Sequence, residues 1–111
     1  SEYFEDAKNR MTYLMNKIAE RELHVARFYM KKKAYIAALN RAKYVLENYN
    51  QSIHQEEALV ISISAYEYLD INDLKNDTIR ILEVNYPNSE FYKQRNKTSK
   101  KEWWKFWESL K

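Results

Sequence analysis

The sequence contains no glycine and no cysteine, and its only proline is Pro87. Sheet-rich folds depend on tight turns, and these turns are usually built from glycine, proline or Asn-Gly pairs. Helices joined by short polar loops need none of them, so the composition predicts an all-α protein. The lack of cysteine excludes a disulfide framework and a thiolate metal site. The lack of glycine excludes a glycine-rich phosphate loop.

Long apolar runs are also missing, because no stretch approaches the roughly 20 residues that cross a bilayer. The chain shows no signal peptide and begins at Ser1 rather than at a methionine. We interpret it as a fragment of a longer protein, whose localisation signals would lie upstream. Its 111 residues, of which 45% are apolar and 32% charged, suit one globular domain with one core.

Apolar residues recur at spacings of three and four along most of the chain, which is typical of helices with one buried face. The first helix is expected over residues 3–33, and its length indicates that its two halves serve different neighbours. Three further helices are expected over residues 34–49, 53–69 and 74–85. The starts of the last two are predicted from a capping box and a polar pair, Ser52 with Gln55 and Asn72 with Asp73.

The end of the sequence differs from the rest in its charge and its aromatic content. Residues 93–111 carry seven basic and two acidic side chains, a net charge of +5, and they contain all three tryptophans of the chain. We therefore divide the chain into a helical repeat domain, residues 1–92, and a basic, tryptophan-rich tail, residues 93–111. Because the domain is near neutral, no nucleic-acid partner is expected.

Two serines mark helix starts near and within this tail. Ser89 is expected to open a short helical stretch, and Ser99 with Glu102 forms a predicted capping box before a terminal helix. Three roles suit a helix that carries tryptophans among lysines. It folds back to cap the open end of the repeats, anchors a partner protein, or lies in a membrane interface. The first of these roles is favoured.

Internal repetition decides the architecture. Residues 48–52 (NYNQS) recur as residues 85–89 (NYPNS) at an offset of 37 residues, and Tyr29 and Tyr66 obey the same offset. A helix pair that recurs every roughly 34 to 40 residues indicates a helical solenoid, in which neighbouring units cover each other's apolar faces. The sequence therefore predicts a tetratricopeptide-like helical-repeat fold, an α-solenoid with a long first helix.

The first unit carries the pattern of this repeat family. Ala26, Tyr29, Tyr35 and Ala38 resemble the small and aromatic positions of the tetratricopeptide repeat. Small alanines let two helices approach closely, while the tyrosines fill the adjacent holes. Lys33 stands where the pattern normally has glycine.

A narrower resemblance lies in residues 21–29 (RELHVARFY), 34–41 (AYIAALNR) and 44–49 (YVLENY). These segments resemble the C-terminal repeats of the BamD family, also called ComL, which are outer-membrane lipoproteins of the β-barrel assembly machinery. The resemblance covers about residues 1–90 and includes surface residues that packing does not require. The tail departs from the family pattern.

The resemblance implies a protein-binding scaffold, not an enzyme, on the periplasmic face of the bacterial outer membrane. In this family the C-terminal repeats grip the last POTRA domain of the barrel-forming subunit, and other lipoproteins of the complex are further candidate partners. Membrane attachment is expected only through a lipidated N-terminus upstream of Ser1. Asn40 and Arg41 match the family's Asn-Arg pair, so the resemblance implies that Arg41 faces the partner.

No catalytic constellation and no cofactor or metal site is predicted from the titratable residues. The two histidines are isolated in the sequence and are interpreted as packing or surface residues. The carboxylates of Glu20, Glu22, Glu56 and Glu57 are expected in a first helical turn or on a solvated helix face.

We expect partner binding on the second predicted helix, where the planar guanidinium of Arg41 suits a carboxylate. The full set of partner-binding candidates is Arg41, Asn40, Tyr35, Tyr44, Lys33, Trp103, Trp104 and Trp107. Two alternatives stay open. One is a generic adaptor that binds a short peptide in a concave groove lined by first-helix residues such as Arg27 and Lys31. The other is a membrane or nucleic-acid binder that works through the basic tail.

Overall fold

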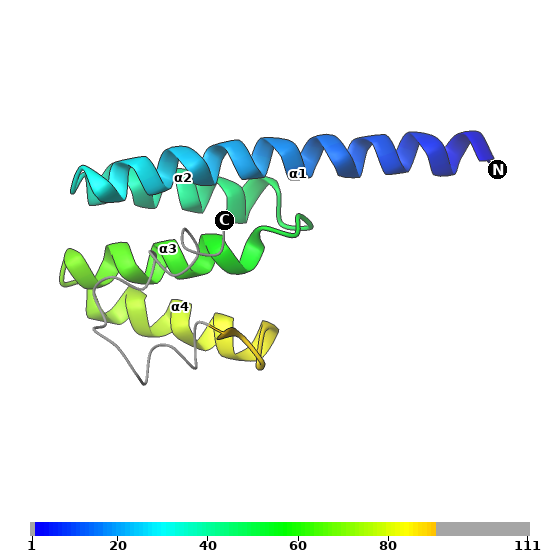
Figure 1. The fold of residues 1–111 in the computed structure, drawn as a ribbon. Coiled ribbons are helices and arrows are strands. Elements are labelled where there is room, and N and C mark those ends of the chain that lie inside the picture. The colour runs from blue at the N-terminus through cyan, green and yellow to red at the C-terminus, as the bar shows by residue number, and fades with distance from the viewer. Residues whose placement is uncertain (1, 91–111) are drawn as a thin grey trace.

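The computed structural model describes residues 2–90, and these residues fold into α-helices without any strand (Figure 1). The four helices are α1 Glu2–Lys31, α2 Tyr35–Asn48, α3 Gln55–Tyr68 and α4 Asn72–Asn85. The predicted all-α fold is confirmed. The terminal helix expected after Ser99, and all but the beginning of the stretch expected from Ser89, lie outside the described residues.

The helices form two antiparallel hairpins, α1 with α2 and α3 with α4, and one hairpin is stacked on the other. Each helix packs against the next one along the chain, as Figure 1 shows, and α3 also touches α1. Stacked helix pairs are the architecture of a helical-repeat solenoid. The predicted tetratricopeptide-like arrangement is therefore present in two units.

Small side chains occupy the places where the helices cross. Ala26 of α1 and Ala38 of α2 are fully buried, and Tyr29 and Tyr35 pack partly buried against the same core. These four residues thus have the small and aromatic roles that the repeat pattern predicts. The central helix is α3, in which ten consecutive residues, 57–66, are buried because other helices cover it on most sides.

The 37-residue offset is visible in the turns that follow α1 and α3. Lys33 and Asp70 are the described non-glycine residues with positive φ, both at 63°. After each of them, the next amide donates 2.9 Å back to a tyrosine carbonyl, Ala34 to Tyr29 and Ile71 to Tyr66. This is the left-handed helix end that glycine favours. The left-handed conformation of Lys33 explains why the repeat pattern normally has glycine at this place.

The ends of α2 and α4 repeat in the same way. Asn48 and Asn85 each donate from Nδ2 to the carbonyl four residues earlier, at 3.0 Å. Four residues later come the buried Ser52 and Ser89, whose amides each donate to a tyrosine carbonyl at 3.0 Å. The repeated sequence NYNQS and NYPNS therefore encodes a repeated loop structure.

The capping box predicted for α3 is wrong. The helix begins at Gln55, and the Ser52 hydroxyl accepts a 3.3 Å hydrogen bond from the amide of His54, which lies before the helix. The neighbouring amide of Ile53 instead donates to Asn16 Oδ1 of α1 at 3.0 Å. A contact between segments 37 residues apart thus fixes this loop, and local capping rules did not anticipate it.

The start of α4 also differs from the prediction. The helix begins at Asn72, so Asn72 and Asp73 lie inside its first turn and do not cap it from outside. Asp70 has a left-handed backbone conformation, which ends the turn after α3. The next residue, Ile71, is already the N-cap of α4, and its side chain makes no capping hydrogen bond. The connection is therefore shorter than the polar residues suggest.

The first half of α1 projects beyond the other helices (Figure 1). Every residue from 2 to 14 is exposed, including the apolar Phe4, Met11 and Leu14 at 64%, 69% and 57%. From Ala19 onward the same helix buries its apolar face in the core. The second half of the long helix therefore packs in the core, while the separate neighbour expected for its first half stays a prediction.

Candidate partner-binding surface

Three of the predicted partner-binding residues lie together on α2. Asn40, Arg41 and Tyr44 are all exposed. Tyr44 is four residues after Asn40 and three after Arg41, so its side chain adjoins both on the helix surface. We call these three residues the α2 surface. It offers a cation, an amide and an aromatic ring to a partner.

Arg41 is held in place by an ion pair with α1. Its Nη1 donates to Glu22 Oε2 at 3.0 Å, and the two side chains are 44% and 18% exposed. This hydrogen bond, together with the charge of Glu22, raises the pKa of the Arg41 guanidinium above its ordinary value. Solvent screens such a pair, so it adds little stability. Its main effect is to orient the guanidinium, whose other N–H groups can still reach a partner carboxylate.

Tyr44 is exposed, yet it is also positioned by a neighbour. Its ring meets the ring of Tyr49 edge to face, with centroids 5.7 Å apart. A hydrogen bond with Tyr44 raises the pKa of the Tyr49 hydroxyl, and desolvation and the charge of Glu22 add to the effect. The ring of Tyr44 is therefore held against Tyr49 at the end of α2.

The structure places two other predicted residues away from the α2 surface. Tyr35 is partly buried, and its ring stacks on Tyr68 of α3 with centroids 4.3 Å apart, so it packs the two units together. Lys33 is exposed in the turn before α2. It precedes Arg41 by eight residues, which corresponds to about 12 Å along a helix.

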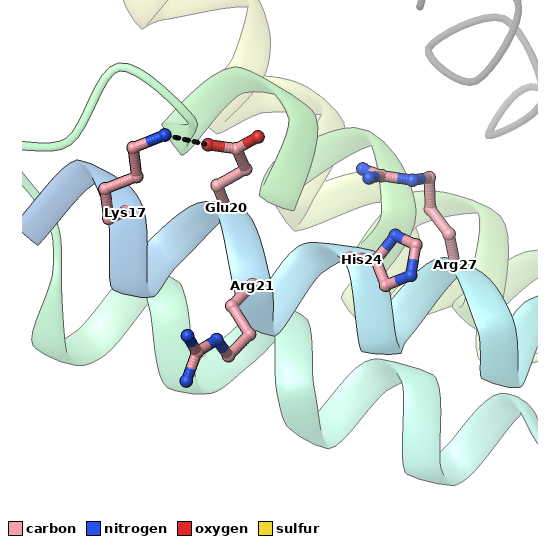
Figure 2. A pocket seen from close by; sticks show the side chains of 5 residues that line it. All are labelled: Lys17, Glu20, Arg21, His24 and Arg27. Atoms are coloured by element: carbon pink, nitrogen blue, oxygen red, sulfur yellow. Dashed lines mark ion pairs between the residues drawn. The ribbon is translucent and has the colours of Figure 1, made fainter.

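A second candidate surface lies on α1, where five side chains line a depression of about 440 Å³ (Figure 2). Lys17 and Glu20 pair with each other at 3.9 Å, and Figure 2 shows the side chain of Arg21 pointing away from this pair. His24 and Arg27 line the other end of the depression. Because Lys17 is paired with Glu20, the depression offers fewer unpaired cations than the basic residues in its lining suggest.

Arg27 and Glu57 form a buried ion pair between α1 and α3, with side chains 6% and 5% exposed. Arg27 lines the depression on α1, but its charge is already paired. Glu57 lies in the first turn of α3, as predicted, and its side chain is buried there. Burial of an unpaired charge is costly, so each of these residues needs the other. Thirty residues separate them in the sequence, and neither spacing nor composition indicates the pairing.

Sequence analysis missed the role of Glu22 of α1, which orients Arg41 of the α2 surface. Helix spacing predicts a solvated face for Glu22, but its side chain is mostly covered. Helix periodicity places both residues near the contact between the first two helices. Only the packing of α1 on α2 brings a carboxylate and a guanidinium 19 residues apart into hydrogen-bond distance.

Residues 2–90 contain no group of three or more histidine, aspartate or glutamate side chains that could hold a metal ion. In the same part of the chain, no helix combines the length and the apolar character needed to span a membrane. The remaining predicted site residues, Trp103, Trp104 and Trp107, lie outside the described residues.

Comparison with known proteins identifies the family of this chain. A family model described as YfiO, an outer membrane lipoprotein, matches residues 1–82. The match contains α1, α2 and α3 completely, and with them the α2 surface and its partner Glu22.

Several relatives carry the name outer membrane protein assembly factor BamD. The one from Neisseria meningitidis serogroup B is 43% identical over 107 residues, which are 96% of this chain and 40% of that protein. The one from Haemophilus influenzae is 38% identical over 85 residues, or 77% and 32% of the two chains. The one from Rickettsia prowazekii is 34% identical over 92 residues, or 83% and 37%. This chain thus spans less than half of the length of these relatives. It belongs to the YfiO family of outer membrane lipoproteins, and its resemblance to BamD is confirmed.

Proposed function

We propose that this chain is a protein-binding scaffold of the machinery that assembles outer-membrane β-barrels, and that it acts at the periplasmic face of the outer membrane. Its family is one of outer membrane lipoproteins, and its relatives are named as outer membrane protein assembly factors. The partner is a POTRA-type domain of the barrel-forming subunit, and other lipoproteins of the complex are further partners. A lipidated segment upstream of Ser1 provides the membrane attachment. The work is binding, without turnover or a cofactor.

The observation that carries this proposal is the geometry of Arg41. Its guanidinium is 44% exposed, and Glu22 holds it in one orientation beside Asn40 and Tyr44. A pre-oriented arginine next to an amide and an aromatic ring suits a partner that presents a carboxylate and an apolar edge. Because the arginine is already ordered, less side-chain entropy is lost on binding.

The first experiment is a calorimetric titration of the chain with the last POTRA domain of the barrel subunit. The variant Arg41→Glu should weaken binding by about tenfold or more, which is about 1.4 kcal/mol. Arg10→Glu is the matched control, because Arg10 is a 79% exposed arginine near the free end of α1 and its charge reversal is identical. Equal affinities for Arg41→Glu and Arg10→Glu would remove Arg41 from the interface.

A charge swap separates a binding role of Arg41 from a structural one. The double variant Glu22→Arg with Arg41→Glu restores the ion pair between α1 and α2 with reversed polarity. If the partner recognises the cation itself, the double variant stays as weak as Arg41→Glu. Recovery of binding in the double variant would mean that the pair only supports the fold.

A generic peptide-binding adaptor is the second candidate, and the depression on α1 favours it. Arg21 and His24 are exposed there, and their N–H donors suit an acidic peptide. The same titration decides between the two surfaces, because Arg21→Glu should leave POTRA binding unchanged if the α2 surface is the interface. If Arg21→Glu abolishes binding and Arg41→Glu does not, the depression is the binding site.

A further inference from the structure

A cavity of about 400 Å³ lies where α2, α3 and α4 meet. Part of its lining is apolar, from Leu46, Leu59 and Ile81. The rest carries the polar groups of Asn50, Gln55, Asn85 and Tyr86. We call it the α2–α4 cavity. Leu59 is almost fully buried, whereas Ile81 is 48% exposed, so the cavity opens to solvent beside Ile81.

One atom of this lining indicates what would bind there. The side-chain oxygen of Gln55, Oε1, is buried and accepts a hydrogen bond from none of the described residues. A buried acceptor without a donor is unfavourable, and such groups are rare in folded proteins. The cavity therefore suits an apolar group that carries a hydrogen-bond donor.

The outer face of α4 beside the cavity is unusually apolar. Ile81 and Val84 are 48% and 79% exposed, and Leu74 on the same side of the helix is 47% exposed. The residues at the equivalent places of α2, 37 positions earlier, are Tyr44 and Glu47, which carry a hydroxyl and a carboxylate. An apolar strip on the last described helix of a repeat stack therefore indicates a covering segment.

The chain leaves the described region close to the cavity. The hydroxyl of Ser89 donates to the carboxylate of Glu56, the residue next to Gln55 in the first turn of α3. Residues 91–111 follow from this point. The thirteen steps from Glu90 to Trp103 can span at least about 20 Å, the rise of a helix and roughly the length of α4, so the tryptophans are within reach.

The distribution of net charge favours contact of the tail with α2, α3 and α4. Residues 35–90 carry nine acidic and four basic side chains, a net charge of −5, and residues 91–111 carry a net charge of +5. Residues 1–34 carry eight basic and five acidic side chains, a net charge of +3. The tail is therefore attracted to α2, α3 and α4 more strongly than to the exposed first half of α1, where residues 2–14 have a net charge of only −1.

We propose that the tryptophan-rich tail is an intramolecular cap, and that one of Trp103, Trp104 and Trp107 fills the α2–α4 cavity. Its indole N–H donates to Gln55 Oε1, and its ring packs against the apolar lining. The indole suits this site because it is a large apolar group with one donor and no acceptor. The inference does not depend on which partner the α2 surface binds.

Tryptophan fluorescence tests the proposal directly, because every tryptophan of the chain lies in the tail. Three full-length variants each keep one tryptophan and have the other two replaced by phenylalanine. Acrylamide quenching is then compared between the folded chain and the same chain in urea. We expect at least one variant to be quenched several-fold less when folded, with emission shifted to the blue. Equal quenching in both states for all three variants would overturn the proposal.

Cavity substitutions then locate the protected tryptophan. Gln55→Leu and Ile81→Asp should raise its quenching toward the unfolded level, whereas the control Ile36→Asp, at a 63% exposed position of α2, should not. Circular dichroism verifies that each variant stays helical. If Ile81→Asp unfolds the protein, the result for Gln55→Leu decides the test by itself. Protection that survives the cavity substitutions would place the tail elsewhere. If the protection of the tryptophan from acrylamide disappears when the protein is diluted, a second copy of the chain covers it. Either result overturns the proposal.

Discussion

Arg27 of α1 and Glu57 of α3 bury opposite charges against each other in the middle of the molecule. Removing one partner leaves the other charge buried and unpaired, which costs about 3–5 kcal/mol. We therefore expect Glu57→Ala to lower the free energy of unfolding by that amount, measured by urea denaturation. The control Glu20→Ala removes a 49% exposed carboxylate from a surface pair and should change stability by less than about 0.5 kcal/mol.

The double variant Arg27→Met with Glu57→Met measures whether the ion pair adds stability beyond the cost of removing its two charges from water. Apolar side chains of similar size often replace a buried ion pair without loss of stability. The double variant should therefore recover most of what Glu57→Ala loses. If Glu57→Ala and Glu20→Ala cost the same, the pair is hydrated in solution and the burial argument fails.

Lys33 is a residue whose conformation conflicts with its type. Its φ of 63° brings Cβ too close to the neighbouring carbonyl, a strain that glycine avoids. Lys33→Gly should raise the free energy of unfolding by about 0.5–1 kcal/mol, after allowing for the greater freedom of glycine in the unfolded chain. Lys31→Gly, in the last turn of α1, should instead lower it by about 0.5–1 kcal/mol. The same sign for both substitutions in thermal denaturation would contradict this account.

At the scale of the element, α1 combines an unsupported half with a buried half. Residues 2–14 are exposed on all sides, whereas Ala19, Leu23 and Ala26 are fully buried. Isolated helices of that length are marginal in water, because packing supplies most of the stability of helices in proteins. The amides of residues 6–14 should therefore exchange hydrogen orders of magnitude faster than those of residues 20–31. Uniform protection along α1 would show that its first half is covered in solution.

The remaining elements show which parts of the fold were predictable from local sequence. Periodicity and the offset of 37 residues predict four helices in two stacked units. The start of α3 was not predictable, because Asn16 of a distant helix binds the amide of Ile53 and fixes the loop.

The candidate site was predictable only in part, and for a related reason. The family resemblance directs attention to Arg41 and Asn40, and helix spacing places Tyr44 beside them. The carboxylate that orients Arg41, on Glu22, and the pairing of Arg27 with Glu57 depend on how α1 packs against α2 and α3. Contacts between residues 19 and 30 positions apart leave no signal in one sequence, because any exposed-looking glutamate could supply them.

At the scale of the whole molecule, α3 couples the two units. One side of the helix contributes Ile61 and Ala65 to the core shared with α1 and α2, and another side contributes Val60 and Ile63 to the core shared with α4. Neither unit can lose its packing without exposing part of α3. The stack should therefore unfold as one cooperative body, even though nearest-neighbour coupling would allow its units to open separately.

Leu82 of α4 tests this coupling, because it is fully buried in the second core and distant in sequence from α2. Leu82→Ala should destabilise the protein by about 2–5 kcal/mol, whereas Val84→Ala, at a 79% exposed position, should cost less than about 0.5 kcal/mol. Native-state hydrogen exchange then decides between coupled and separate units. If α3 transmits the loss, the slowest amides of α2 lose as much protection as those of α4. If α2 keeps its protection while α4 opens, the two units fold independently and the capping of α4 matters only locally.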